Sequence, residues 1–458
     1  MSFISISKTA LAVLLAVGSV NACPSGTRHS NNNNINNTAA AVKPVGAAAV
    51  ATSPEIVPPS GGGYSNGGGM HATTYFAGYH AKRSKAFTVE QMPWSKYTDV
   101  KYAFAETTAN GTLDMHKSAP EELPKFVKAA HAAGVKAQLA IGGWSGSIHF
   151  GSNVGDAKNR TAFVKTCLDT VKQYDLDGLD FDWEYPGRQG LGCNAVGPND
   201  TLNFMAFLQE LRREQPKPLL LSAAVSLFPY NNKDGQRSAN GELSKMAELL
   251  DYSIIVGYDI FGAWAGTGGP NAPLAFSCDS KRNNQGGIKE GIEAWVGAGY
   301  PKEKLVLGFG AYGHGFTVEN KEAFGPDGAL LAYPKNSGQR RQGSTWDDDP
   351  LVDDCGGAQP ASGTFTVWSM VQEGKFLDEA GNPAPGIAHG FDNCSQTPFL
   401  YDNATQWWVS YDNAQSIKAK GGYLTSNKLA GFAMWEAGGD FKNLTVDAIR
   451  SAVGLPKA

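Results

Sequence analysis

Three carboxylates alternate with apolar residues in one short stretch of the chain. Asp180, Asp182 and Glu184 are separated by Phe181 and Trp183, which is the period of a strand whose successive side chains point to opposite faces. The three acids would then share one face, roughly 6.6 Å apart along the strand. Carboxylates crowded in this way repel one another, which raises at least one pKa. A carboxylic acid that stays protonated near neutral pH is what general acid catalysis requires.

The predicted strand ends beside the last of these acids. Tyr185 and Pro186 follow Glu184, and proline cannot donate a hydrogen bond to a strand ladder. In a parallel α/β barrel, the carboxyl ends of the strands carry the active site. A divalent metal site is one alternative, because alternating carboxylates can ligate Mg²⁺ or Ca²⁺; a purely structural row of acids is another. We expect acid catalysis with neither a metal ion nor another cofactor.

Length and charge limit the classes of protein to consider. The chain has 458 residues and a formal net charge of −4, enough for one large domain or two to three average ones. It has no basic patch, so we expect no nucleic-acid partner. After the N-terminal segment no stretch is long and apolar enough to cross a bilayer, so no membrane partner is expected either. Nothing indicates an oligomer, and a monomer is predicted.

The first 72 residues are interpreted as export and spacer sequence. Residues 1–22 resemble a secretory signal peptide, with Lys8 before the apolar run 9–20 and Ala22 at a plausible cleavage point. Residues 23–72 are low in complexity and cannot bury enough apolar area to order themselves. The protein is therefore expected to be secreted, extracellular or in the cell wall. Seven sequons would suit N-glycosylation there: Asn36, Asn110, Asn159, Asn199, Asn393, Asn403 and Asn443.

Secretion places the cysteines in an oxidising compartment, where disulfides form. The chain has six cysteines, and six allow fifteen pairings. We favour the pairs Cys193–Cys278 and Cys355–Cys394. None of the cysteine spacings resembles a zinc site.

The remaining chain, residues 73–458, alternates predicted strands with predicted helices. Strands are expected over 74–79, 100–105, 135–142, the acidic stretch, 219–226, 252–258, 304–310 and 429–435, and helices over 124–133, 159–174, 201–214, 243–250, 288–297, 414–420 and 446–453. This alternation implies parallel βαβ units. Eight of them suggest a closed (β/α)₈ barrel, the TIM-barrel fold of the α/β class. An open doubly wound sheet is the alternative, although its usual Gly-rich dinucleotide fingerprint is missing.

One interval breaks the alternation. Residues 313–401 are too many for a structureless loop in a compact domain. We interpret them as an α+β subdomain inserted after the seventh strand, with Cys355 and Cys394 inside it.

Several strand ends together resemble one enzyme family. Asp177, Asp180, Asp182 and Glu184 match the DxxDxDxE signature of family 18 glycoside hydrolases, the chitinases. Further segments resemble that family in the same order along the chain: Tyr75–Tyr79, Tyr102–Ala105, Ile141–Trp144, Tyr258–Asp259 with Gly262 and Trp264, Gly308 with Tyr312–His314, and Gly431–Glu436. The residues of these motifs are most similar to those of secreted fungal enzymes that carry the inserted subdomain.

The resemblance implies hydrolysis of the β-1,4 linkages of chitin or chitooligosaccharides with retention of configuration. Family 18 is an exception among retaining enzymes, because the acetamide of the substrate is the nucleophile. By resemblance, Glu184 is the acid and then the base, and Asp182 orients the acetamide. Asp180 shares a proton with Asp182, and Tyr258 binds the acetamide from the other side.

The same resemblance assigns a second set of residues to substrate binding. Trp435 would form the floor under the distorted sugar. The other expected contacts are Tyr75, Tyr79, Phe104, Trp144, Tyr185, Asp259, Trp264 and Tyr312; core packing is the alternative role for each of them. Three positions depart from the family pattern: His314 replaces a common arginine, Val256 a common methionine, and Ala140 a common serine that could bond Asp180.

Two other functions on the same fold stay open. A non-catalytic chitin-binding lectin is one, although such relatives typically lose the acid that is present here as Glu184. An endo-β-N-acetylglucosaminidase acting on glycoprotein glycans is the other, and the inserted subdomain argues for a deep groove instead.

Overall fold

The computed structural model describes residues 69–276 and 285–456. These residues belong to one compact unit, Pro58–Ala458. The predicted signal peptide, the predicted spacer up to residue 68 and Cys278 lie outside the described residues. No helix in the described part of the chain is long and apolar enough to cross a membrane.

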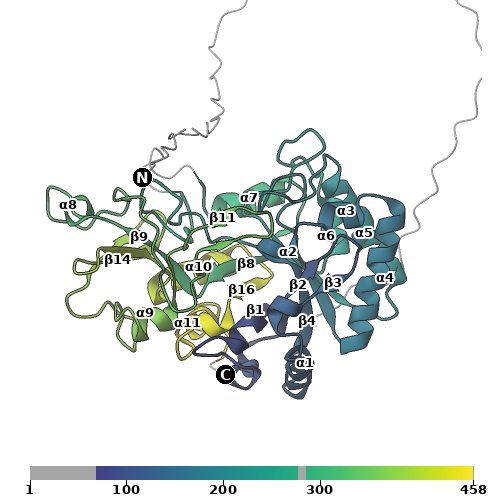
Figure 1. The fold of residues 1–458 in the computed structure, drawn as a ribbon, viewed down its shortest axis with the longest axis horizontal. Coiled ribbons are helices and arrows are strands. Elements are labelled where there is room, and N and C mark those ends of the chain that lie inside the picture. The colour runs from purple at the N-terminus through teal and green to yellow at the C-terminus, as the bar shows by residue number, and fades with distance from the viewer. Residues whose placement is uncertain (1–68, 277–284, 457–458) are drawn as a thin grey trace, which may run out of the picture. The chain divides into compact units, whose positions relative to one another are not determined.

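Eight parallel strands form a closed barrel (Figure 1). In their order around the barrel they are β1 (His71–Ala77), β2 (Asp99–Thr107), β4 (Lys136–Gly142), β5 (Gly178–Asp182), β6 (Leu220–Val225), β7 (Tyr252–Ile255), β8 (Leu305–Gly310) and β16 (Gly431–Trp435). The ring closes because β1 pairs with both β2 and β16. The predicted (β/α)₈ barrel is confirmed, and the open doubly wound sheet is wrong.

Helices pack on the outside of this barrel. The longer ones are α1 (Leu123–Ala132), α4 (Ala157–Tyr174), α5 (Asp200–Glu214), α6 (Ser244–Leu249), α7 (Ile288–Gly297), α10 (Ala414–Ser426) and α11 (Leu444–Ala452). The start of α4 follows from its sequence, because the Asp156 side chain accepts a hydrogen bond from the backbone N–H of Asn159. The buried residues of α4 recur at helical spacing: Phe163, Val164, Cys167 and Val171.

Short elements fill the loops of the barrel. They are β3 (Leu113–Asp114), α2 (Gly143–Gly146), α3 (Phe150–Val154) and the 3₁₀ helices Gly78–Lys82, Val89–Gln91, Trp94–Lys96, His116–Ser118, Lys302–Lys304 and Ala437–Gly439.

The acidic stretch is only partly a strand. Leu179 and Phe181 pack into the apolar core, as the alternation predicts. The strand β5 ends at Asp182, however, so Glu184 does not share a strand face with the other two acids. Trp183 is buried and stacks on Phe150, with ring centroids 5.1 Å apart. Glu184, which follows this buried indole, therefore lies at the beginning of the loop after the strand.

An antiparallel sheet is inserted between β8 and α10. Its strands run in the order β12 (Thr364–Thr366), β9 (Tyr312–Thr317), β15 (Trp407–Ser410), β14 (Thr397–Asp402) and β13 (Ala388–Asp392). The segment also contains α8 (Asn320–Ala323), α9 (Val367–Gln372) and a small hairpin of β10 (Leu351–Val352) and β11 (Ala358–Gln359). The sheet extends beyond residue 401, because β15 pairs with β9 up to Ser410.

The disulfide pairing differs from the prediction. Cys193 is bonded to Cys355, with Cα atoms 5.5 Å apart, so the predicted pairs Cys193–Cys278 and Cys355–Cys394 are wrong. The physical reason is that the β10–β11 hairpin carries Cys355 away from its own subdomain to the loop after β5, and only cysteines that approach this closely can be bridged. Cys394 is disulfide-bonded as well. Cys167, buried in α4, is a free thiol.

Candidate active site

The three acids lie in sequence at the carboxyl end of β5. Asp180 is fully buried inside the barrel, whereas Asp182 and Glu184 are half-buried at its mouth. The backbone of Glu184 is held on both sides: its N–H donates to Ser147 Oγ at 3.0 Å, and its carbonyl accepts from Asn194 Nδ2 at 2.9 Å. These two hydrogen bonds hold the backbone of Glu184 and so restrict where its carboxyl group can lie.

Gly142 brings the end of the neighbouring strand β4 against Asp182. A Cβ on Gly142 would lie 2.1 Å from the Asp182 carbonyl oxygen, and Gly142 has a φ of +110°. Both observations require glycine at this position. The turn places Trp144, on α2, at the mouth of the barrel with 47% of its surface exposed.

Two hydroxyl groups hold the buried Asp180. Tyr75 donates to Oδ2 at 2.9 Å, and Ser222 donates to Oδ1 at 2.5 Å. In the sheet, Asp180 stands between Ala140 on β4 and Ser222 on β6. The hydroxyl that the sequence appeared to lack at position 140 is therefore supplied by the strand on the other side.

A chain of polar contacts continues from Ser222 into the barrel interior. Gln138 Nε2 donates to Ser222 Oγ at 3.0 Å, and the Tyr252 hydroxyl lies 3.2 Å from Gln138 Oε1. The same hydroxyl donates to Asp99 Oδ1 at 2.5 Å and accepts from Lys101 Nζ at 2.7 Å. Lys101 also pairs with Asp99 at 3.0 Å, and both are buried.

Burial and neighbouring charges set the protonation of the acids. Burial raises the pKa of Glu184 to about 7, with the nearby charge of Asp259 acting in the same direction. Burial and the charges of Glu184 and Asp180 raise the pKa of Asp182 well above its usual range. Burial also raises the pKa of Asp180, against the opposing effect of the Lys101 charge and the two hydroxyls. The site can thus hold protons on its acids near neutral pH.

Tyr258 and Asp259 lie just beyond β7, which ends at Ile255, three residues before the predicted limit of 258. Tyr258 packs edge-on against Tyr312, with centroids 6.1 Å apart. Asp259 Oδ1 accepts from the Tyr312 hydroxyl at 2.5 Å and lies 2.7 Å from His314 Nε2. His314, which replaces a common arginine, still reaches Asp259 by its ring nitrogen.

Trp435 ends β16 and has aromatic neighbours from two other strands. Its ring stacks on Phe104 at 5.4 Å between centroids and 19° between planes, and lies 5.1 Å from Tyr75. Trp435 also lines a cavity together with Tyr79 and Tyr312. The strand ends thus gather these five aromatic residues around the mouth of the barrel.

Three non-proline cis peptide bonds adjoin residues of this region. They precede Phe104, Tyr185 and Glu436.

Of the other two predicted contact residues, Trp264 is peripheral and Tyr185 lies beside Glu184. Trp264 is 52% exposed and touches the His314 ring edge-on, with centroids 5.1 Å apart. The Tyr185 side chain interacts with the Glu184 carboxyl by a hydrogen bond that lowers the pKa of that group, and it carries the guanidinium of Arg188 over its ring at 4.1 Å. Asp177, the first acid of the signature, lies at the opposite end of β5 and accepts from the backbone N–H of Ala137, so it does not belong to the site.

Sequence reasoning missed Ser222 and Lys101. Each is a polar residue inside a largely apolar predicted strand: Ser222 follows three leucines, and Lys101 lies between Val100 and Tyr102. A lone polar residue in a strand that is buried on both faces needs a partner inside the barrel. That signal could have identified both.

Comparison with known proteins places this barrel in a family. The model of the glycosyl hydrolases family 18 matches residues 71–440, and the chain belongs to this family. A "chitinase-like effector" of Moniliophthora roreri is 43% identical over 387 residues, which cover 84% of this chain and 93% of the relative. Chitinase A1 of Niallia circulans is 28% identical over 67% of this chain and 41% of its own. The crystal structure of a chitinase from Rhizomucor miehei superimposes with a TM-score of 0.73 at 29% identity, covering 83% of this chain and 99% of that one.

In the ranges 69–276 and 285–456, no three His, Cys, Asp or Glu side chains gather in a way that could hold a metal ion.

Proposed function

We propose that this protein is a chitinase that hydrolyses β-1,4-linked N-acetylglucosamine chains by substrate-assisted, retaining catalysis. The observation that carries the proposal is the pair of acids at the end of β5, with burial raising the pKa of Glu184 to about 7 and that of Asp182 well above its usual range. A glutamic acid with such a pKa is protonated in much of the population at neutral pH and can donate its proton.

The first step breaks the glycosidic bond. Glu184 gives its proton to the glycosidic oxygen while the acetamide carbonyl oxygen of the sugar being cleaved attacks the anomeric carbon of that same sugar. The leaving sugar departs with the bonding electron pair and the proton, and the acetamide becomes an oxazolinium ion. Attack within one molecule is fast because the nucleophile is already in position.

Asp182 binds and orients the acetamide in this step. It accepts a hydrogen bond from the acetamide N–H and offsets the positive charge that develops on the ring. Asp180 lies behind Asp182 in the same strand, and the two share a proton. The Tyr75 and Ser222 hydroxyls hold Asp180 in place for this exchange.

The second step restores the enzyme. Glu184, now ionised, takes a proton from water while the water oxygen attacks the anomeric carbon on the face that the leaving sugar vacated, and the bond from that carbon to the acetamide oxygen on the opposite face breaks. The two displacements give overall retention. Trp435 supplies the apolar floor under the sugar, and its contact with Phe104 fixes the plane of the indole. The N-terminal residues 1–22 support export as part of the proposal.

A test compares wild type with Glu184→Gln on colloidal chitin, by release of N-acetylglucosamine oligomers. Wild type is expected to release oligomers and the variant at least about 10²-fold fewer, because the amide cannot donate the proton. Both proteins should bind soluble oligomers and unfold at similar temperatures. Product from wild type should first appear as the β-anomer.

A second candidate is a chitin-binding protein without turnover. It is favoured by the 43% identical relative whose name is a chitinase-like effector. Oligomer binding by both proteins with hydrolysis by neither would support this candidate and contradict the chitinase proposal.

A further inference from the structure

One segment of the inserted subdomain leaves its sheet and reaches across to distant loops. We call residues 348–361 the strap. Its two ends are held together at Asp347, whose carboxylate accepts from the backbone N–H of Gly343 at 2.8 Å and of Gly363 at 2.9 Å. The Ser362 hydroxyl donates to the same carboxylate at 2.5 Å. The strap therefore projects from a closed neck.

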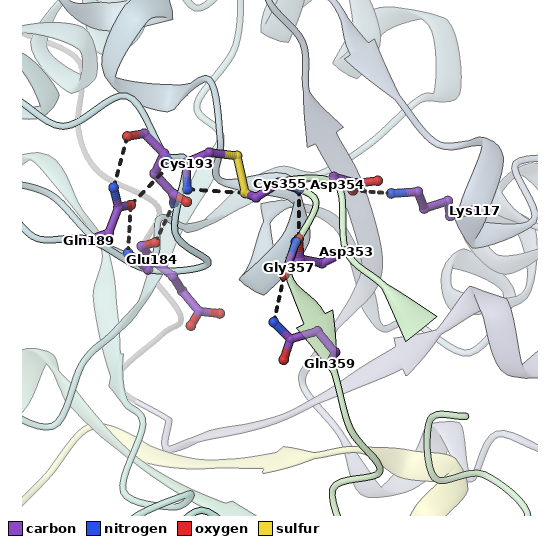
Figure 2. The surroundings of a disulfide bond; sticks show 11 residues. Lys117, Glu184, Gln189, Cys193, Asp353, Asp354, Cys355, Gly357 and Gln359 are labelled. Atoms are coloured by element: carbon purple, nitrogen blue, oxygen red, sulfur yellow. Dashed lines mark hydrogen bonds and ion pairs between the residues drawn. A yellow bond between two sulfur atoms is a disulfide. The ribbon is translucent and has the colours of Figure 1, made fainter. Parts of the chain in front are cut away.

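The tip of the strap is tied down at two places (Figure 2). Cys355 is bonded to Cys193 in the loop after β5, and the Cys193 N–H donates to Cys355 Sγ at 3.2 Å. Asp354 accepts from Lys117 Nζ at 2.6 Å, and Lys117 also lies 3.1 Å from Glu106 near the end of β2. One tie is covalent and the other is ionic.

The positions of these ties in the barrel show where the strap runs. In the ring of eight strands, β8 is opposite β4, and the strap begins in the subdomain that follows β8. Its tip is tied to the segments that follow β2 and β5, the two strands on either side of β4. Seven residues from neck to tip span roughly 23 Å when extended. At the neck, Arg83 in the loop after β1 donates to the Trp346 carbonyl at 3.1 Å and to Asp348 at 3.2 Å. All these attachments follow the carboxyl ends of strands, so the strap spans the mouth of the barrel from the β1 side to the β4 side.

The strap is ordered by its own hydrogen bonds and not by a core. Asp353 Oδ1 accepts from the N–H groups of Cys355 and Gly357, both at 2.8 Å, and Gln359 Nε2 donates to Oδ2 at 2.6 Å. Val352, by contrast, is 70% exposed. A segment with so little apolar burial keeps its place through the contacts at its neck and at its tip.

The loop that receives the strap lies directly on the proposed acid. Asn194, next to Cys193, donates through Nδ2 to the Glu184 carbonyl at 2.9 Å. A Cβ on Gly190 would lie only 2.0 Å from the same oxygen, so the loop is in close contact with the backbone of Glu184. The disulfide therefore fixes the strap to the wall that carries the acid.

We propose that the strap closes the groove at Glu184 into a passage that a linear amino-sugar chain enters by one of its ends. The identity of the chain rests on the proposed function. The disulfide keeps the passage closed, so branched glycans and chains blocked at both ends are excluded, while free chain ends and short oligomers are accepted. The endo-β-N-acetylglucosaminidase alternative, which requires branched glycoprotein glycans, is disfavoured for the same reason.

The experiment measures binding without turnover, in the Glu184→Gln protein. The probes are chitooligosaccharides long enough to cross the barrel mouth, either unblocked, or biotinylated and capped with streptavidin at one end or at both ends. With the strap closed, the doubly capped oligomer should bind at least about tenfold more weakly than the singly capped one. Adding Cys193→Ser with Cys355→Ser should remove this difference and leave binding of the unblocked oligomer unchanged.

Two controls keep the result interpretable. Lys117→Met removes only the ionic tie and should preserve the difference. If the double serine variant does not fold, replacing residues 351–359 by a short glycine linker opens the strap while the neck at Asp347 stays intact.

The outcomes separate the two proposals. Equal binding of doubly and singly capped oligomers to the closed protein would overturn the strap proposal alone. Binding that depends on the strap, with no hydrolysis by wild type, would overturn the proposed function alone. No binding of the unblocked oligomer would overturn both.

Discussion

Two groups of buried carboxyl groups occupy the same barrel and differ in whether a lysine accompanies them. Toward the amino ends of the strands, Asp99 pairs with the buried Lys101 at 3.0 Å. Although burial alone would raise the pKa of Asp99, Lys101, His71 and the Tyr252 hydroxyl lower it. At the mouth, no lysine pairs with Asp182 or Glu184, and burial raises the pKa of both; for Glu184 burial outweighs the opposing effects of the Tyr185 hydrogen bond and the Arg188 charge.

The groups around a buried acid, and not the residue type, therefore decide its protonation. Asp180 lies between the two groups and feels both. Burial raises its pKa, and the charge of Lys101 lowers it. The lysine thereby favours the ionised form of Asp180, the acid that is proposed to share a proton with Asp182.

The largest expected effect comes from removing the lysine. Lys101→Met leaves Asp99 buried without its cation, and breaking a buried pair in this way lowers the free energy of unfolding by about 3–5 kcal/mol. It also removes the cation that lowers the pKa of Asp180. Because that pKa then rises, the acidic limb of the kcat/KM profile should move to higher pH. Urea unfolding and the pH profile are the measurements.

The chain offers a matched control for this variant. Lys420 and Asp412 form a second ion pair that is almost completely buried, with no part in the hydrogen bonds of Asp180. Lys420→Met should destabilise the protein by a similar amount and leave the pH profile in place. If the two variants gave the same profile, Lys101 would be a structural residue only.

A smaller effect is expected from the hydroxyl on Asp180. Ser222→Ala removes a hydrogen bond to a group that is charged during turnover, worth about 1.5–3 kcal/mol, and kcat/KM should fall at least about tenfold. Gln138 Nε2 stays satisfied, because it also donates to the carbonyl oxygens of Leu179 and Leu220.

The rescue uses the opposite neighbour of Asp180. Ala140→Ser, added to Ser222→Ala, offers a hydroxyl from β4 and should recover most of the lost kcat/KM. No recovery in a protein with unchanged thermal unfolding would show that only a hydroxyl on β6 can serve Asp180.

Local patterns in the sequence predicted most of the barrel. The helix at 288–297 has the predicted bounds, and β8 begins one residue later than expected. These elements depend on apolar spacing and end signals that lie within a few residues of one another. Closure of the ring also follows from the count of βαβ units. The acid motif placed Asp180 and Asp182 on β5 for the same local reason.

Contacts between distant segments could not be predicted in this way. Ser222 faces Asp180 only because β6 pairs with β5 in one register, and the alternation within each strand does not specify that register. Cys355 lies 162 residues after Cys193 in the sequence, and the strap brings the two together in space. Spacing alone could not choose among fifteen pairings. Glu184 was misplaced because the pattern of alternating acids continues beyond the end of the strand.

The most direct test of this account is the pH dependence of kcat/KM for wild type on a soluble chitooligosaccharide. This parameter reports the pKa of the acid in the free enzyme. Burial outweighs the Tyr185 hydrogen bond and the Arg188 charge and raises the pKa of Glu184 to about 7, so the protonated acid is lost as pH rises through that value. Activity should fall about tenfold per pH unit above about 7. A profile that already falls in the ordinary range of exposed glutamic acids, about pH 4 to 5, would contradict the claim that burial prepares Glu184 as the acid.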